Sequence, residues 1–160
     1  MAEKYFDEIE FDIENFKNAI GGKGRILSID FGTKKIGIAM TDESRRIATP
    51  FDIYQRKTLD YDIDFFVHLI DKYKICGFVI GVALIDGQFL GNKRLFFMIR
   101  QFVRRIIERK NIPYLFYDEA FSSHASHEEL YGFGLTKKQI ARQEDKIVAA
   151  NFLKDVFDLI

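Results

Sequence analysis

The sequence predicts one α/β domain, in which three antiparallel strands lead into parallel β-α-β units and helices cover both faces of a mixed sheet. Three observations predict this class. The chain has 160 residues, a length suited to a single domain. Two apolar runs flank a short glycine-containing loop, as in a hairpin, and a continuous apolar run then follows a segment with helical spacing.

The first two predicted strands are RILSID at 25–30 and IGIAMTD at 36–42, joined by the loop FGTKK. A loop of this length containing Gly32 is typical of an antiparallel hairpin. A third strand over IATPFDIY, 47–54, would complete a meander. Glycines 21, 22 and 24 predict a boundary between an N-terminal extension, 1–24, and the sheet domain, 25–160.

Two β-α-β units are predicted after the meander. Apolar residues at helical spacing over 60–73 precede ICGFVIGV at 75–82, a run typical of a strand covered on both faces. A helix over 92–110 and a strand over 112–117 repeat the pattern, and two helical segments follow, one beginning at the capping box from Thr136 to Gln139. The predicted order is β-β-β-α-β-α-β-α-α.

The first twenty residues carry one apolar seam at spacings of three and four, formed by Phe6, Ile9, Ile13, Phe16 and Ile20. This spacing predicts an amphipathic helix. We interpret it as a helix docked on its own domain, in preference to an arm that binds a partner.

Composition limits the classes of function. Lys plus Arg equals Asp plus Glu at 24 each, so any surface that binds a polyanion must be a local patch. Cys76 lies within an apolar run, which predicts burial in a strand and no redox or metal role. The acidic N-terminus has no apolar leader and no run is long enough to span a bilayer, so we expect a cytoplasmic protein without a membrane partner.

Three acids carry the candidate chemistry. Asp30 ends the first strand and Glu119 follows the last, so both should lie at the carboxyl edge of the sheet. Asp145 lies on the apolar stripe of the final helix, where an ionised carboxylate is costly unless it is compensated. Such carboxylates suit hard divalent cations, and two cations so held would promote hydrolysis of a phosphodiester.

Each acid also has an ordinary structural interpretation. Asp30 could form the turn before Gly32, Glu119 could be a solvated acid at a strand end, and Asp145 could cap the last helix. Position alone leaves both interpretations open.

The string SIDFGTKKIGIAMTD, 28–42, resembles the opening motif of the YqgF family of Holliday junction resolvases and pre-16S rRNA maturation nucleases. FVIGVALIDG, YDEAFSSHAS and EDKIVAANFL resemble its next three motifs in order, so the resemblance runs from Arg25 to the C-terminus. It implies an RNase H-like fold and a nuclease whose catalytic and metal-binding residues are Asp30, Glu119 and Asp145. The implied cofactor is Mg²⁺ or Mn²⁺, as two ions.

The chain departs from the family pattern at several positions. Ala120 replaces an arginine, Ala83 a loop proline, and Ser122 and Ser123 a pair of threonines. Ala120 removes a guanidinium that could hold a phosphate, so we expect weaker activity or a different substrate.

Basic residues give candidate contacts to nucleic acid. Lys93, Arg100 and Arg104 fall within about 40° on one helical face, and either phosphate contact or mere solubility would explain them. Lys34 and Lys35 could neutralise a phosphate near the hairpin loop. His124 and His127 lack a third ligand nearby, so we predict no transition-metal site.

The predicted function is a metal-dependent nuclease acting on an rRNA precursor or on branched DNA. A non-catalytic nucleic-acid-binding protein on the same fold is one alternative. IDFGTKK also resembles the first phosphate loop of actin, Hsp70 and sugar kinases, but those proteins close two such domains around ATP and this chain holds one. The sequence leaves both a monomer and a homodimer open.

Overall fold

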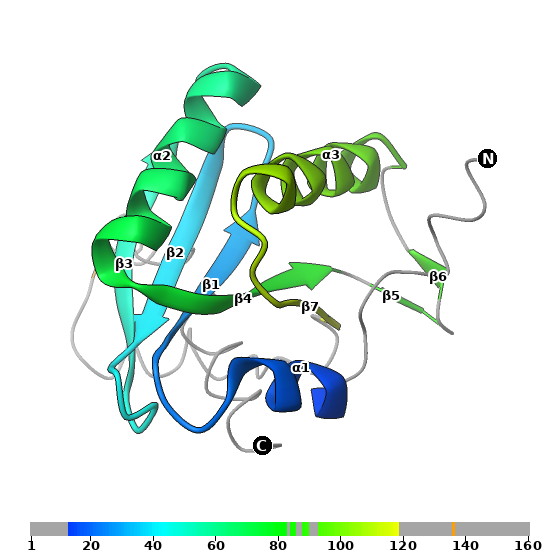
Figure 1. Cartoon of the computed structure of the whole chain (residues 1–160). Coiled ribbons are helices and arrows are strands. Elements are labelled where there is room, and N and C mark those ends of the chain that lie inside the picture. The colour runs from blue at the N-terminus through cyan, green and yellow to red at the C-terminus, as the bar shows by residue number, and fades with distance from the viewer. Residues whose placement is uncertain (1–12, 83, 86–87, 90–92, 119–135, 137–160) are drawn as a thin grey trace.

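A five-stranded mixed sheet forms the centre of the computed structural model, which describes residues 13–82, 84–85, 88–89, 93–118 and 136 (Figure 1). The strand order is β3-β2-β1-β4-β7. The strands are β1 (Arg25–Phe31), β2 (Lys35–Thr41), β3 (Ala48–Gln55), β4 (Ile75–Val82) and β7 (Tyr114–Asp118). β1, β2 and β3 form an antiparallel meander, and β4 runs parallel to both β1 and β7. The predicted mixed sheet is confirmed.

Helices cover both faces of the sheet. α2 (Leu59–Tyr73) and α3 (Lys93–Arg109) lie on one face, and α1 (Ile13–Ile20) lies on the other (Figure 1). The alternation of β1 explains the two layers, because Leu27, Ile29 and Phe31 join the core under α2 and α3 while Ile26 packs with α1. The same alternation assigns Asp30 to the α1 face.

Aromatic rings fill the space between β1, α2 and α3. The Phe102 ring of α3 lies 5.1 Å from the ring of Phe31 and 5.1 Å from the ring of Phe66 in α2, centroid to centroid. Tilted and edge-on pairs of this kind add to the stabilisation that burial alone gives. The end of β1 is therefore held rigidly on its α2 and α3 face.

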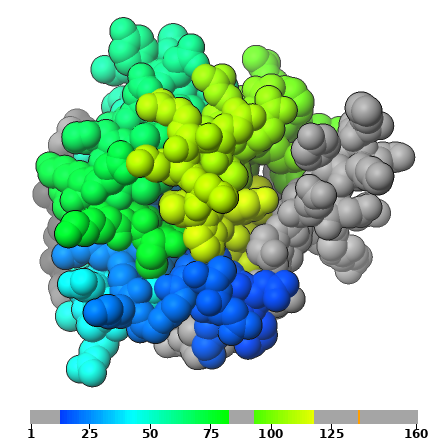
Figure 2. Space-filling model, viewed as in Figure 1, coloured from blue at the N-terminus to red at the C-terminus, as the bar shows by residue number. Residues whose placement is uncertain are grey.

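α1 packs closely on the opposite face. Phe16 and Ile20 are buried against β4 and β7, and Figure 2 shows the surface of α1 lying directly against that of the α3–β7 segment. A Cβ on Gly77 would come within 2.7 Å of the Ile20 side chain, so the absence of a side chain there permits the approach. This described part of the N-terminal seam is docked on its own domain, as predicted.

One side chain joins the glycine-rich segment after α1 to the β2–β3 turn. The Arg45 guanidinium donates hydrogen bonds to the carbonyls of Ile20, Gly21, Lys23 and Gly24. The Arg45 backbone is in the left-handed region, with a φ of 58°. A cation at these carbonyls also complements the negative end of the α1 dipole.

The structure differs from the sequence predictions in two places. A small antiparallel ribbon, β5 (Leu84–Ile85) with β6 (Gln88–Phe89), follows β4 and was not predicted, because two-residue strands are too short to show a period of two. Cys76 lies in β4 as predicted but is half-buried, and its Sγ donates to the Arg25 carbonyl at 3.1 Å. The helices predicted after β7, and Phe6 and Ile9, lie outside the described residues.

Candidate functional site

Asp30 stands near the carboxyl end of the central strand with a glycine on each side. It pairs with Gly37 of β2, and the parallel register of Ile29 with Ile80 brings Gly81 of β4 beside it. Glycine adds no side chain, so neither neighbouring strand covers the half-buried Asp30 carboxylate from the side. The arrangement leaves lateral space for a ligand at this carboxylate.

The loop after β1 completes a pocket with Asp30. Gly32, Thr33, Lys34 and Lys35 line that pocket together with Asp30, and both lysines are exposed. The Gly32 amide donates to the Lys35 carbonyl at 3.0 Å, and a Cβ at Gly32 would lie 2.5 Å from that oxygen. The turn therefore requires glycine at this position, and it brings positive charge close to Asp30.

Arg56 supports this loop from outside the pocket lining. Its Nη1 donates to the carbonyls of Gly32 and Thr33 at 3.4 and 3.3 Å, and its backbone amide donates to the Lys34 carbonyl at 2.9 Å. The guanidinium also lies 4.5 Å from the centre of the Phe31 ring, a favourable cation–π distance. One residue thus holds three consecutive carbonyls of the loop.

Asp62 of α2 holds Arg56 in turn. Its carboxylate is fully buried and accepts from Arg56 Nε at 3.0 Å and from the Lys57 amide at 2.9 Å. Burial, with a hydrogen bond to Asp62, raises the pKa of Tyr54 to about 12. Sequence reasoning missed this pair. The signal was available, because Asp62 shares a helical face with the apolar residues Phe66 and Leu69, and an acid on a buried face needs a partner.

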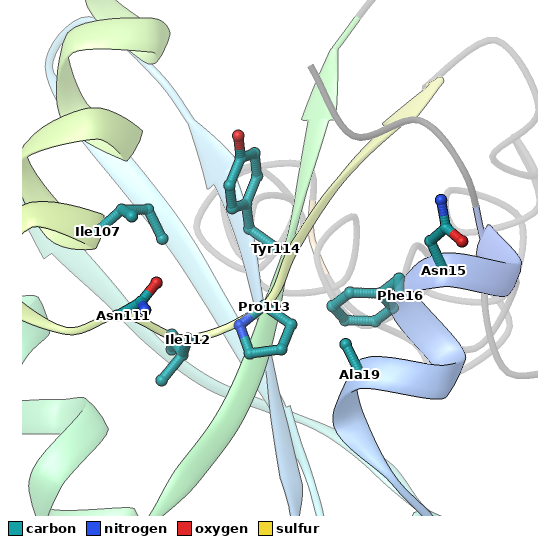
Figure 3. Close-up of a pocket in the computed structure, with 8 residues that line it drawn as sticks. All are labelled: Asn15, Phe16, Ala19, Ile107, Asn111, Ile112, Pro113 and Tyr114. Carbon is teal, nitrogen blue, oxygen red and sulfur yellow. The ribbon is translucent and has the colours of Figure 1, made fainter. Parts of the chain in front are cut away.

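A second hollow lies between α1 and the connection from α3 to β7 (Figure 3). Its lining residues are Asn15, Phe16, Ala19, Ile107, Asn111, Ile112, Pro113 and Tyr114. None of them is charged, and the hollow lies at the amino end of β7. In sheets of this type ligands bind at the carboxyl ends of the parallel strands, which favours the Asp30 pocket as the functional one.

Basic residues at the carboxyl end of α3 and just after it form ion pairs with acids. Arg105, Arg109 and Lys110 form ion pairs with Asp60, Asp64 and Asp71 of α2, and Arg104 lies 3.5 Å from Glu108. These ion pairs with α2 involve none of the three predicted residues, Lys93, Arg100 and Arg104. Lys93 is exposed at the start of α3, and the half-buried Arg100 lies 5.9 Å from the Phe96 ring.

The structure places part of the predicted site. Asp30, Lys34 and Lys35 line one pocket, while Glu119, Asp145, Ala120, His124 and His127 lie outside the described residues. β7 ends at Asp118, opposite Val82 of β4, and so at the sheet edge where Asp30 lies. Within the described ranges no three His, Cys, Asp or Glu side chains gather as metal ligands, and no helix there is long and apolar enough to cross a membrane.

Residues 24–159 match the family model described as RuvX: Holliday junction resolvase. The chain belongs to the RuvX family. The resemblance to YqgF proteins is thereby confirmed, since the two names denote one family, and so is the predicted class of enzyme, a nuclease of the resolvase type.

Two relatives show the extent of the similarity to this RuvX family chain. A protein of Anaplasma marginale, named "Putative pre-16S rRNA nuclease", is 32% identical over 148 residues, which are 92% of each chain. A protein of Paramagnetospirillum magneticum with the same name is 31% identical and covers 84% of this chain and 85% of its own.

Solved structures show the same fold at low sequence identity. Thermus thermophilus RuvC in complex with a Holliday junction substrate has a TM-score of 0.58 and 11% identity, covering 85% of this chain and 94% of its own. Fowlpox virus resolvase with Holliday junction DNA has a TM-score of 0.53 and 14% identity, covering 85% and 99%. The fold of this RuvX family member is therefore RNase H-like.

Proposed function

We propose that this chain hydrolyses phosphodiester bonds of nucleic acid at the Asp30 pocket, with a divalent cation, and that its substrate is a pre-16S rRNA or a Holliday junction. The observation that carries the proposal is the pocket in which Asp30 lies beside a two-lysine loop, with glycines on both neighbouring strands. The names of the curated relatives and the junction complexes among the structural neighbours support the two substrate classes.

The donor set suits Mg²⁺ or Mn²⁺. Asp30, Glu119 and Asp145 would supply carboxylate oxygens, which hard divalent cations prefer, and the glycines beside Asp30 leave space for them. β1 and β7 are separated only by β4, so about 10 Å lies between their backbones. We propose that Asp30 and Glu119 would hold the cations together at this edge of the sheet.

Each component of the pocket has a role in this proposal. Bound cations would supply Lewis-acid stabilisation of the charge that develops during in-line attack of water on phosphorus. Asp30 would hold these cations at the end of the central strand. Lys34 and Lys35 neutralise the phosphate beside the scissile bond, which lowers the repulsion between the nucleic acid and the acids.

We propose a binding surface for the flanking nucleic acid formed by Lys34, Lys35, Lys93, Arg100 and Arg104. Lys93 and Arg100 belong to the amino half of α3, where Lys93 is exposed and Arg100 is half-buried. Arg104 shares its charge with Glu108 and contributes less. Each substitution that removes a cation from a phosphate should lower the salt slope of binding, in log–log form, by about 0.7 to 0.9.

The test is cleavage of a labelled four-way DNA junction and of a pre-16S rRNA fragment in Mg²⁺ or Mn²⁺. Asp30→Asn, Glu119→Gln and Asp145→Asn should each lower the rate by at least about 100-fold, since loss of a supporting residue behind a ligand already costs 10- to 100-fold. Asp60→Asn, an exposed acid of α2, is the matched control and should leave the rate unchanged.

A melting experiment tests the same carboxylates without a substrate. In chelator Asp30→Asn should melt at or above wild type, because one charge leaves a cluster of like charges. Added Mn²⁺ should raise the wild-type midpoint and affect the variant much less, because ligand binding stabilises only a fold that keeps the site. Undiminished cleavage in all three variants would reject the assigned site. Nucleic-acid binding without cleavage by the wild type would favour the alternative of a non-catalytic binding protein, which the replacement of the family arginine by Ala120 suggests.

A further inference from the structure

The pair formed by Arg56 and Asp62 is built in a way that stability alone does not require. Asp62 is fully buried and the Arg56 side chain is 10% exposed, so both charges have lost most of their hydration. Buried ion pairs of this kind are often no more stabilising than apolar side chains of similar volume. We therefore look for the role of the pair in the loop beside Asp30, which Arg56 holds.

The hydrogen bonds of Arg56 fix the direction of the peptide groups in that loop. Its side chain and backbone hold the carbonyls of Gly32, Thr33 and Lys34 on one side. The described peptides are trans, and in a trans peptide the N–H points opposite to the preceding carbonyl. The amides of Thr33 and Lys34 are thereby directed away from Arg56, which lies outside the lining of the Asp30 pocket.

We propose that Arg56 and Asp62 are a positioning pair that orients loop 32–34 so that its amides and lysines receive a phosphate of the nucleic acid beside Asp30. The inference rests on the proposed function and adds two residues to its machinery. Successive amides aimed at one point attract anions because their partial positive charges add. Release of the three carbonyls would let the peptide groups rotate and present negative oxygens to the phosphate instead.

Arginine is required for this arrangement, whereas charge alone is not sufficient. A lysine at position 56 could pair with Asp62, but its single ammonium cannot also bridge to the loop carbonyls and stack on Phe31. Arg56→Lys therefore distinguishes two roles. Lysine would restore an ion pair whose role is only structural, but it would not restore the position of the loop.

The experiment compares Arg56→Lys, the double variant Arg56→Met with Asp62→Leu, and Arg105→Ala with wild type. Arg105→Ala is the matched control, because it also removes an arginine that pairs with an acid of α2, in this case Asp60. The measurements are the melting midpoint, hydrogen exchange of the amides in 31–36, the dissociation constant for a four-way DNA junction without divalent cation, and the cleavage rate in Mg²⁺.

Both test variants should stay folded, with the double variant near the wild-type midpoint because apolar residues replace the buried charges. In each, exchange of the loop amides should accelerate and junction binding should weaken about tenfold or more, the usual cost of losing a supporting residue. Arg105→Ala should match wild type in exchange and binding.

Several outcomes would overturn the positioning role. An Arg56→Lys variant that is folded and shows unchanged hydrogen exchange in the loop would reject it. Faster loop exchange with undiminished junction binding would also reject it, as would a wild type that does not bind the junction. A wild type that binds but does not cleave would reject the nuclease proposal instead, while exchange and binding would still decide the role of Arg56 and Asp62.

Discussion

Asp42 shows how one surface carboxylate can organise a turn. Its oxygens accept from the amides of Ser44, Arg46 and Ile47 at 3.1, 2.9 and 2.8 Å, and from the Ser44 hydroxyl. These hydrogen bonds, that of the Ser44 hydroxyl above all, lower the Asp42 pKa to about 2. The turn that they define carries Arg45 to the carbonyls after α1.

The lowered pKa predicts a pH dependence for Asp42→Ala. A carboxylate whose pKa falls on folding stabilises the fold above its unfolded value, near 4, and loses that effect as pH falls towards 2. Asp42→Ala should therefore melt below wild type at pH 7, and the gap should narrow between pH 4 and pH 2. Melting curves across this range test it, and Ser44→Ala should give an intermediate gap. A gap that is constant with pH would mean that the carboxylate's charge is irrelevant to the turn.

At the scale of elements, the packing of α1 on β4 depends on a missing side chain. Gly77 faces Ile20 at 2.7 Å, Phe16 at 3.2 Å and the Pro113 carbonyl at 3.2 Å, measured from the position that a Cβ would take. The backbone oxygen cannot move aside as a flexible side chain could. The helix therefore lies at a spacing that only glycine permits.

Gly77→Ala should displace α1 and lower the free energy of unfolding by about 1–3 kcal/mol, the usual cost of overpacking a close contact. Gly22→Ala is the control, because a Cβ there meets nothing within 4 Å. Denaturant unfolding of both variants gives the comparison. Equal stability of the two would show that α1 is not packed on β4 in solution.

The elements with a clear period could be predicted from the sequence. β1, β2, α2, β4 and α3 carry alternating or helical apolar patterns, and the structure confirms their types and order. The ribbon β5–β6 could not be predicted because its strands are two residues long. The neutralisation of Arg105 and Arg109 by α2 depends on how two helices pack, which no local pattern encodes.

At the scale of the whole molecule, the strand order makes β1 the central strand and so places Asp30 in the middle of the sheet, at the carboxyl end of β1. Sequence reasoning predicted this position of Asp30 because strand ends and sheet edges follow simple rules. It did not find Arg56. The hydrogen bond from Arg56 to the Thr33 carbonyl joins residues 23 positions apart, which only folding brings together. Resolvases share this fold at 11% to 14% identity, so the fold persists when most individual side chains differ.

The hydrogen bonds from Arg45 to carbonyls of residues 20–24 should affect proteolysis. Three glycines in four residues, with basic residues at Lys23 and Arg25, have the composition of a segment that trypsin cuts readily. A protease must pull its substrate into an extended form, and here four carbonyls would first have to leave Arg45. Trypsin should therefore cut the native protein slowly after Lys23 and should cut Arg45→Ala there quickly. Arg46→Ala, which changes the exposed neighbour, is the control and should be cut as slowly as the native protein. Mass spectrometry of timed digests would show the difference, and equal rates in the three proteins would mean that the segment opens without releasing Arg45.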